Sequence, residues 1–492
     1  MSNPEGFSEI RDLNLREQPN IVLINCDDLG YGDLGCYGST VHDTPALDRM
    51  AAEGVLLTDF YMASPVCSPS RGAMLTGCYP ARIGFDSFDG MRVLFPGMGI
   101  GLHPDEITIA RLLNDAGYAT AMVGKWHCGD QPEFLPTRHG FDQWLGLPYS
   151  NDMGIQPDLY TPEERVELSK KLGFELPEPL RIPLPLMLDE AVIEAQPDQA
   201  TLTSRYLQES IRFMRDNRDR PFFLYFAHMY VHLPIYVQEQ FAAISRNGPY
   251  GAAVACIDWA ADVLLHELAE LGLDDDTIVI FTSDNGALAR PGEGSNAPLR
   301  ANKGTTWEGG QRVPCIVRGP GRIAAGIECS AMATAMDLYT TIASWCGVNV
   351  PDDRIIDGRD ISDVLEGKTA ESPHEAFYYY SGSSLEAVRS GKWKLHVYKS
   401  GHYGSEGAPT EELYDLAADI GETTDVAADH PVVVARLRQL IDLARHDLGD
   451  GVTGVEGARC RPAGRVHDPV TLTTFDPSHP YYMAEYDLAD RG

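Results

Sequence analysis

The sequence has no apolar run long enough to cross a membrane. A membrane-spanning helix needs roughly 20 consecutive apolar residues, and no such stretch occurs in the 492 residues. Residues 1–20 are polar and include Glu5, Glu9, Asp12 and Glu17, so they also lack the apolar segment of a secretory signal. We therefore expect a cytoplasmic protein that has no membrane partner.

Positive charge is also scarce. The chain has 39 Lys and Arg against 72 Asp and Glu, which gives a net charge of −33. No basic surface is available to gather phosphate groups, so nucleic acid is excluded as a partner. The same charge repels any anionic substrate, and a site for such a substrate must therefore supply its own local cations.

Cysteine spacing typical of metal or redox motifs is missing. The ten cysteines form no CxxC pair and no zinc-type pattern. We predict that most of them are small core residues and that they form no disulfide framework.

Oxygen-bearing side chains are present directly after two predicted strands. Residues 20–26 and 277–282 are short apolar runs rich in β-branched residues, which is typical of buried parallel strands. The side chains that follow them are Asp27, Asp28, Asp284 and Asn285. Ligands bind at the carboxyl ends of strands in open α/β sheets, and a cation relieves the repulsion between neighbouring carboxylates. Although paired Asp residues also cap helices, this oxygen set favours Ca²⁺, with Mg²⁺ and Mn²⁺ as alternatives, over zinc.

Cys67 stands at the centre of an unusual stretch, residues 64–77. Pro65 and Pro69 indicate a loop, and the apolar residues after Arg71 indicate the opening of a helix. A cysteine at a helix N-terminus beside an arginine lies in an environment that favours the thiolate. A lone cysteine in such a place is more simply explained as a buried core residue.

Lys125 and His127 follow the predicted strand at 118–123. They alternate, so on an extended segment both point the same way. A cation and a titratable imidazole at another strand end would supply part of the local positive field. Without that context, a surface lysine and a half-buried histidine explain the pair equally well.

Four further polar residues lie in loops. His228 and His232 follow the predicted strand at 222–227, Lys303 lies in a long glycine-bearing loop, and Ser150 lies in another loop. Each has an ordinary explanation as a loop or core residue, so none indicates a site by itself.

The residues around Cys67 resemble a known signature. Three strings carry the resemblance: Cys67-Ser68-Pro69-Ser70-Arg71, Leu75-Thr76-Gly77 and Tyr79-Pro80-Ala81-Arg82. Together they are similar to the signature of the type I sulfatases, in the arylsulfatase A-like branch of the alkaline phosphatase superfamily. The strings at 124–127, 139–142 and 298–314 are similar to that family as well.

The resemblance implies a modified residue and a metal site. Cys67 would be oxidised by a formylglycine-generating enzyme to formylglycine (3-oxoalanine), so it would be the precursor of the nucleophile. Asp27, Asp28, Asp284 and Asn285, together with residue 67, would hold Ca²⁺. The hydrated formylglycine would attack the sulfur of a small-molecule or glycan sulfate ester.

The resemblance also implies roles for the cations and for Ser150. Arg71 would hold the formylglycine, Lys125 and Lys303 would bind the sulfate, and Ser150 would contact it. These positive side chains would supply the local cations that an anionic substrate needs in a chain with a net charge of −33.

His232 and His127 are the implied proton carriers. The family pattern has its catalytic histidine two residues before a proline, and His232 precedes Pro234 in this way. His232 is then the candidate general acid for the leaving alcohol and a substrate-binding residue, and His127 is the base. The two roles are exchangeable on the sequence alone, and His228 is assigned a structural role.

Three functions are compatible with these residues. The first is a sulfatase. The second is a phosphonate monoester or phosphodiester hydrolase that uses the same formylglycine site, alone or in addition to sulfatase activity. The third is a non-catalytic protein that binds calcium and sulfated glycans, and the complete residue set argues against it.

The strand and helix pattern, with the resemblance, predicts an α/β fold. A large, mostly parallel mixed sheet flanked by helices, as in alkaline phosphatase, is expected with a small C-terminal α+β domain that contains an antiparallel sheet. We divide the chain into a catalytic domain (1–372), a small domain (373–448) and an extended arm (449–492). The arm is expected to pack on a neighbouring subunit, giving a homo-oligomer, or over the cleft. A charged stretch at 161–180 is predicted as a surface helix and connector.

Overall fold

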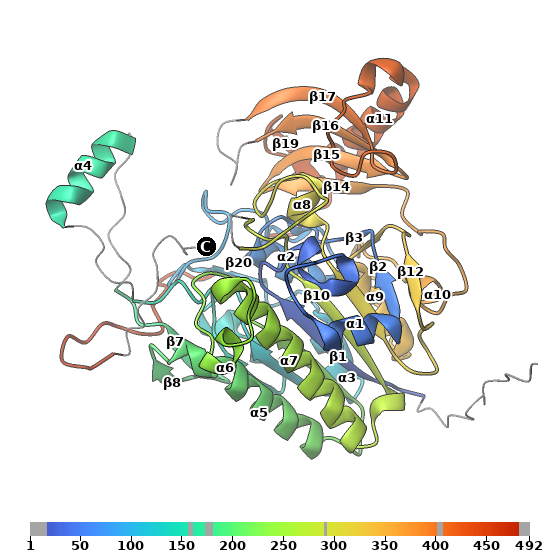
Figure 1. Ribbon diagram of the computed structural model, residues 1–492. Helices are drawn as coiled ribbons and strands as arrows, with labels where there is room; N and C mark the ends of the chain where they lie inside the picture. Colours follow the sequence, from blue (N-terminus) through green and yellow to red (C-terminus); the bar gives the residue numbers. More distant parts are fainter. Residues whose placement is uncertain (1–16, 156–160, 173–180, 290–292, 401–406, 482–492) are drawn as a thin grey trace, which may run out of the picture.

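A ten-stranded mixed sheet forms the centre of the molecule, which confirms the predicted fold class (Figure 1). The computed structural model describes residues 17–155, 161–172, 181–289, 293–400 and 407–481. In sheet order the strands are β12 (Ile327–Cys329), β2 (Val55–Leu57), β11 (Cys315–Arg318), β10 (Thr277–Ser283), β1 (Asn20–Cys26), β9 (Phe222–Ala227), β5 (Ala119–Gly124), β6 (Gln143–Gly146), β7 (Pro185–Leu188) and β8 (Ala191–Ala195). The five strands from β10 to β6 run parallel, and β11, β7 and their outer neighbours add antiparallel pairs.

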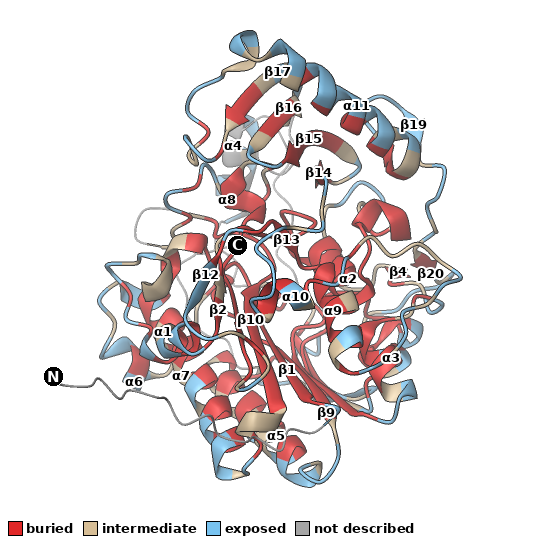
Figure 2. Cartoon of the chain, turned by 90° about the vertical axis from the view of Figure 1, so that its right-hand side faces the viewer, coloured by how far each residue is buried: buried red, intermediate tan, exposed pale blue. Residues whose placement is uncertain are grey.

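Helices cover both faces of this sheet because its central strands are apolar on both sides. In β1, Ile21 and Leu23 belong to one core and Val22 and Ile24 to the other. One face is covered by α2 (Cys67–Thr76), α3 (Ile109–Asp115), α9 (Asp337–Trp345) and α10 (Ser362–Leu365). The other face is covered by α1 (Pro45–Ala52), α5 (Leu202–Asp216), α6 (Glu239–Ala242) and α7 (Gly248–Glu270). The central strands β1, β5, β9 and β10 are buried along their whole length (Figure 2).

The central strands end at the same level of the sheet. Cys26 of β1 lies opposite Ser283 of β10, and both Asn25 and Gly124 lie opposite Ala227 of β9. The residues that follow these strands therefore gather at one edge. Gly124 is required there, because its φ is +111° and a Cβ would lie 1.9 Å from the carbonyl oxygen of Ala227.

The small C-terminal domain has the predicted antiparallel sheet. Its strands, in order, are β14 (Phe377–Ser381), β15 (Ser384–Ser390), β16 (Trp393–Lys399) and β17 (Ala408–Asp415), and α11 (Pro431–Leu448) packs on β15 and β16. In Figure 1 this domain lies above the central sheet.

A buried charge cluster joins the two sheets. Glu308 opens α8 (Glu308–Gln311), which belongs to the large domain. Its carboxylate accepts hydrogen bonds from Lys394 Nζ at 3.0 Å and Tyr379 OH at 2.7 Å, both in the small domain, and lies 3.3 Å from Arg312 Nη1. The pairing satisfies charges that would otherwise be buried alone.

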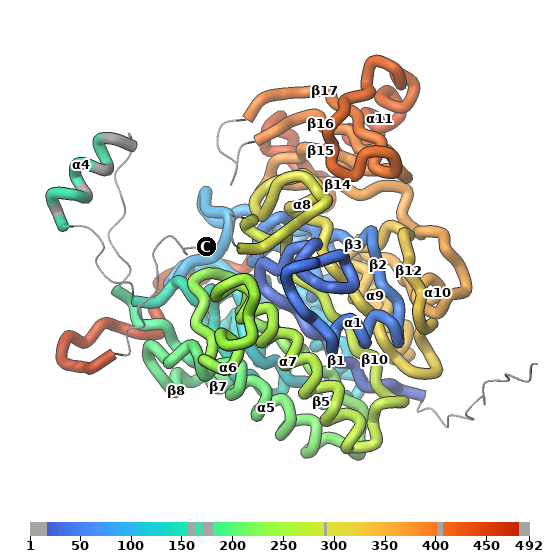
Figure 3. The backbone as a smooth tube through the Cα atoms, viewed as in Figure 1, coloured from blue at the N-terminus to red at the C-terminus, as the bar shows by residue number. Residues whose placement is uncertain are grey.

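The chain after α11 returns to the large domain (Figure 3). Strands β18 (Gly449–Asp450) and β19 (Val455–Glu456) pair with each other, and β20 (Gly464–Arg465) pairs with β4 (Ile100–Gly101). Farther on, the Gln131 side chain donates to Val470 O at 2.9 Å and accepts from Val470 N at 3.0 Å. The predicted arm thus packs in part on its own large domain, while residues 482–492 lie outside the described part of the chain.

Some elements differ from the expectation or were missed. The charged insert contains α4 (Pro162–Leu172), which projects from the body in Figure 1, and the connector at 173–180 lies outside the described residues. The strands missed were short: β2, β3 (Phe60–Tyr61), β4, β6, β7, β8, β11, β12, β13 (Ala333–Thr334), β18, β19 and β20. All ten cysteines are free, as predicted, and no helix in the described ranges is long and apolar enough to span a membrane.

Candidate active site

Four oxygen side chains meet at the carboxyl edge of the sheet. Asp27 and Asp28 follow β1, and Asp284 and Asn285 follow β10, its parallel neighbour. Ligand atoms of Asp27, Asp28, Cys67 and Asp284 all lie within 4.8 Å of one another, and all four residues are buried. The predicted convergence of the strand ends is what brings them together.

Asn285 tests whether this cluster suits a cation. Its Nδ2 donates to Asp28 Oδ1 at 2.7 Å, but its buried Oδ1 has no hydrogen-bond partner in the part of the chain that the structure describes. An orphaned amide oxygen beside three buried carboxylates needs a positive partner. The donor set of hard oxygens fits Ca²⁺ or Mg²⁺.

Two carboxylates of this cluster, Asp27 and Asp284, have pKa values shifted from the ordinary one. Burial alone would raise the pKa of Asp27, but Lys125, His232 and Arg71 lower it well below its usual range. Burial and the charge of Asp27 raise the pKa of Asp284. Crowded carboxylates with opposed shifts are typical of sites that bind cations.

Cys67 is the first residue of α2, so the helix N-terminus points at the cluster. Its Sγ lies 3.4 Å from Asp27 Oδ1, and the residue is 1% exposed. The expected thiolate-favouring environment is wrong. Burial raises the pKa of the Cys67 thiol well above its ordinary value, and the lowering effect of Lys125 does not offset that rise. The sulfur therefore stays protonated as a donor to Asp27.

Arg71 lies one helical turn after Cys67 and on the same face of α2. Its Nε donates to Asp284 Oδ2 at 2.8 Å, and its Nη1 donates to the carbonyl oxygen of Lys125 at 2.8 Å. This buried guanidinium ties the helix to two strand ends and fixes residue 67 against the cluster.

Lys125 and His127 both reach the site, although the segment that carries them is not extended. Lys125 Nζ lies 2.6 Å from Asp27 Oδ2. His127 has a φ of +59°, and its Nε2 donates to the carbonyl oxygen of Leu94 at 2.9 Å. Its Nδ1 has no partner among the described residues. Burial and Lys125 lower the pKa of His127, so the ring is neutral and Nδ1 is free to accept a proton.

His232 and His228 differ as expected. His232 Nδ1 lies 2.6 Å from the carbonyl oxygen of Leu233, and its Nε2 faces the cluster at 3.9 Å from Asp28 Oδ2. Both nitrogens of His228 are engaged, with Thr203 Oγ1 at 3.1 Å and the backbone N–H of Tyr230 at 2.9 Å. Of the two, His232 is the one that opens to the pocket described next.

A pocket of about 360 Å³ opens above the cluster. Cys67, His127, Ser150, His232 and Lys303 line it, and Lys303 Nζ lies 2.8 Å from Asp28 Oδ2. The predicted site residues are thus either in the wall of this pocket or directly beneath it.

The sequence did not indicate the rest of the pocket wall. The other lining residues are Gly90, Met91, Arg92, Val93, Phe95, Asp152 and Met153. Residues 90–95 form a loop without any periodic pattern, so no sequence signal marked them. Asp152 and Met153 lie two and three positions after Ser150, and that proximity was the available signal.

Comparisons with known proteins agree with this geometry. The sequence model of the family described as Sulfatase matches residues 19–348, and the one described as N-sulphoglucosamine sulphohydrolase, C-terminal, matches residues 301–446. Arylsulfatase A from Homo sapiens is 39% identical over 473 residues, which cover 90% of this chain and 90% of that protein. Steryl-sulfatase from Mus musculus is 36% identical over 526 residues, covering 90% of this chain and 83% of that protein.

A solved structure gives the same result in three dimensions. The PsFucS1 sulfatase from Pseudoalteromonas sp. superposes with a TM-score of 0.77 at 27% sequence identity. The superposition covers 87% of this chain and 89% of that one. The likeness therefore extends over both domains of the molecule.

Proposed function

The chain belongs to the sulfatase family and is a sulfuric ester hydrolase, and we propose that it works through a formylglycine formed from Cys67 and a Ca²⁺ ion held by the oxygen cluster. The observation that carries this proposal is the convergence of Cys67, three carboxylates and two lysines beneath one pocket. A formylglycine-generating enzyme is then a necessary partner during maturation.

Two groups would supply chemistry that the twenty ordinary side chains do not. Asp27, Asp28, Asp284 and Asn285 would hold the ion, which supplies a Lewis acid that lowers the pKa of a bound hydroxyl. The hydrated aldehyde of residue 67 supplies an oxygen nucleophile in place of the thiol.

The cations of the site act on the sulfate. Lys303 and Lys125 would neutralise the sulfuryl oxygens as negative charge builds on them, and Arg71 orients residue 67 through its contacts with Asp284 and the 125 carbonyl. Such preorganised charges cost no reorganisation when the reaction occurs, and each is worth roughly 10²–10³ in rate.

The two histidines move the protons. His232 Nε2 faces the cluster, so this nitrogen would donate a proton to the leaving alcohol oxygen. His127 holds its own proton on Nε2 through Leu94, so its Nδ1 would accept a proton from the hydroxyl of residue 67. In both rings the outer nitrogen donates to a carbonyl oxygen, so His232 would act as the acid as an imidazolium, with Asp28 3.9 Å from its Nε2, while His127 would act as the base through its unprotonated Nδ1.

The first experiment measures the mass of the tryptic peptide 50–71 from protein made in the native host, together with hydrolysis of an aryl sulfate and an aryl phosphonate. We expect loss of H₂S and gain of one oxygen at Cys67, and a higher kcat/KM on the sulfate. Cys67→Ala is the control and should be inactive on both. An unmodified, active Cys67 would contradict the proposal, and faster phosphonate hydrolysis would support the other formylglycine-dependent activity.

A further inference from the structure

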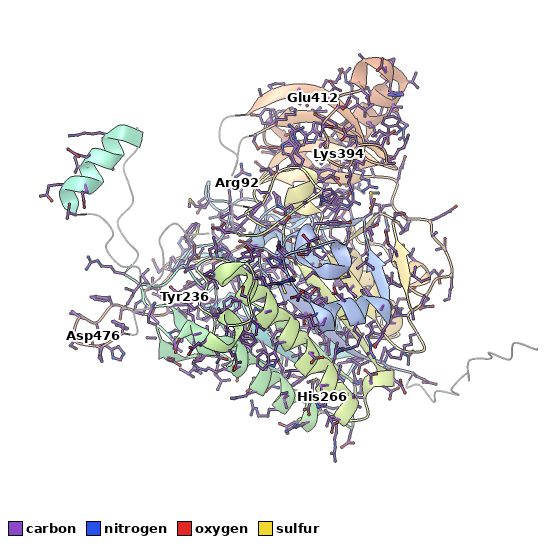
Figure 4. The ribbon with its side chains drawn as sticks, in the orientation of Figure 1. Arg92, Tyr236, His266, Lys394, Glu412 and Asp476 are labelled. Carbon is purple, nitrogen blue, oxygen red and sulfur yellow. The ribbon has the colours of Figure 1, made fainter. Side chains whose placement is uncertain are left out.

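Arg92 is the cation of the pocket wall that the proposed chemistry does not use. It lies in the loop at 90–95 and lines the pocket together with Cys67 and Lys303. Figure 4 shows it at the level where the large and small domains meet. It is half-buried, so its guanidinium has lost part of its water.

The charge of Arg92 is not neutralised by a direct partner. Among the described residues, no carboxylate oxygen lies within the 4.0 Å of an ion pair from its guanidinium. In contrast, Arg71, Lys125 and Lys303 each contact a carboxylate of the cluster. Burial lowers the pKa of Arg92, and the charges of Glu386 and Asp86 act on it only from a distance. A partly desolvated guanidinium without a counter-charge favours an anion from outside.

The small domain holds Arg92 in place. Its Nη1 donates to Ser381 Oγ at 2.7 Å, at the end of β14. The guanidinium packs so closely on the following turn that a Cβ at Gly382 would lie 2.9 Å from Nη1. One edge of the guanidinium is thus fixed, which leaves the remaining N–H groups for a ligand. Preorganisation of this kind lowers the entropy lost on binding.

The pocket wall around Arg92 is mostly apolar, although Asp152 also lines it. Met91, Val93, Phe95 and Met153 line the same pocket. This composition suits the carbon skeleton of an alcohol that carries a ring.

We propose that the natural substrate carries a second oxyanion, a carboxylate or a further sulfate, on the alcohol that leaves, and that Arg92 binds it. The proposal rests on the sulfatase activity and names the substrate class of that same site. The second anion would be held by Arg92 while the reacting sulfate lies against Lys303 and residue 67. A net charge of −33 makes such a dianion costly to bind without this extra cation.

The test uses matched phenyl sulfates that carry a carboxylate, a sulfonate or a neutral carboxamide, each at the meta and para positions. For the native protein we expect kcat/KM for at least one anionic substrate to exceed that for its carboxamide by about tenfold to a hundredfold, as for one charge-assisted hydrogen-bonded pair. The carboxylate and sulfonate arms distinguish the two kinds of oxyanion. The substituted phenols also differ in how readily they leave. Comparing the anion-to-carboxamide ratio of kcat/KM between the native protein and the variants cancels that difference.

Three variants give the contrast. The quantity compared is kcat/KM for the anionic substrate divided by kcat/KM for its carboxamide. Arg92→Gln should bring this ratio close to that of a site without charge preference. Ser381→Ala, which removes only the hydroxyl that positions Arg92, should lower the ratio in part. Arg49→Gln, an exposed arginine that pairs with Asp262, is the matched control and should keep the native ratio.

Binding measurements separate the two proposals. In Cys67→Ala protein, calorimetry gives the dissociation constants of the carboxylate and carboxamide esters without turnover, and Arg92→Gln in that background should remove the difference. Equal binding of the two esters at both ring positions would overturn the role of Arg92, as would a preference that survives Arg92→Gln. Absence of turnover by aldehyde-bearing protein, with the binding preference intact, would instead overturn the proposed function alone.

Discussion

The two adjacent aspartates after β1 are each matched by one lysine. Lys125 Nζ lies 2.6 Å from Asp27 and Lys303 Nζ lies 2.8 Å from Asp28. Neighbouring carboxylates repel each other strongly in a buried site, and Lys125 stabilises the charged form of Asp27. Lys303 also lines the pocket, where its ammonium group can meet the oxygens of a substrate.

Lys303→Ala should lower kcat on an aryl sulfate by about a hundredfold or more, because it removes a preorganised charge next to the reacting group. Lys368→Ala, which removes an exposed lysine, should leave kcat unchanged. Turnover should be measured on protein whose aldehyde content at residue 67 has been determined. A native rate for Lys303→Ala would mean that the loop that carries Lys303 does not bind the sulfate.

At the same scale, the sequence predicted site residues unevenly. Asp27 and Asp284 were predictable because strand ends and hard oxygens follow general rules. The titration of Cys67 was not, because its burial and its carboxylate neighbours depend on a strand more than 200 positions away. Arg92 was not predictable either, since only the fold brings its loop beside Ser381.

Secondary-structure elements were predictable where burial gives them a clear pattern. Strands β1, β5, β9 and β10 are continuous apolar runs, and each lies within one or two residues of its predicted bounds. The missed edge strands lack that pattern: β8, for example, is exposed or half-exposed along its whole length. Such edge strands form because a neighbour offers hydrogen bonds, and a local sequence pattern does not reveal that neighbour.

The segment after α11 packs on the large domain through β4 and Gln131. Strand β20 pairs with β4, and Gln131 makes two hydrogen bonds with the backbone of Val470. Because Gln131 is buried, these bonds are shielded from water and are costly to lose.

Gln131→Met keeps the volume of the side chain but removes both bonds, together with the one that Nε2 donates to Asp130 Oδ1 at 2.6 Å, and should lower the free energy of unfolding by about 1–3 kcal/mol. Urea denaturation measures that loss, and limited proteolysis should cut the segment after residue 465 faster than in the native protein. Gln240→Met changes an exposed glutamine and is the control. Equal stability and equal cleavage would show that the segment is held by other contacts.

At the scale of the whole molecule, charge is distributed unevenly. The chain carries a net charge of −33, yet buried cations concentrate at the pocket and between the domains. Burial alone would raise the pKa of Glu308, but Lys394, Arg312 and Arg389 lower it below its ordinary range. The cluster therefore stabilises the joined domains only while Glu308 is ionised.

This lowered pKa predicts a loss of stability in acid. The folded pKa of Glu308 lies below the ordinary value of 4.5, so its stabilisation is present above about pH 4.5 and is lost as the pH falls below that value. Glu308→Gln should cost about 3–5 kcal/mol near pH 7, because it leaves buried cations unpaired. The difference between native and variant, measured in urea at pH 7, 5 and 4, should shrink toward acid.

Glu239→Gln provides the control for that series, since Glu239 is exposed. It should differ from the native protein by less than about 0.5 kcal/mol at every pH. A native–Glu308→Gln difference that stays constant from pH 7 to 4 would mean that folding does not lower the pKa of Glu308.

The burial of Cys67 also limits how long this residue is accessible during synthesis of the chain. Arg71 of the same helix bonds to Asp284, which lies 213 positions later in the chain. At synthesis rates of roughly 5–20 residues per second, roughly 10–40 s pass between the appearance of these two residues at the ribosome. An enzyme that oxidises Cys67, as proposed, would have that interval to bind the residue, before β10 is synthesised and α2 packs onto the sheet. If Cys67 is modified as proposed, the yield of active protein should therefore depend on the rate of that modification relative to the rate of folding.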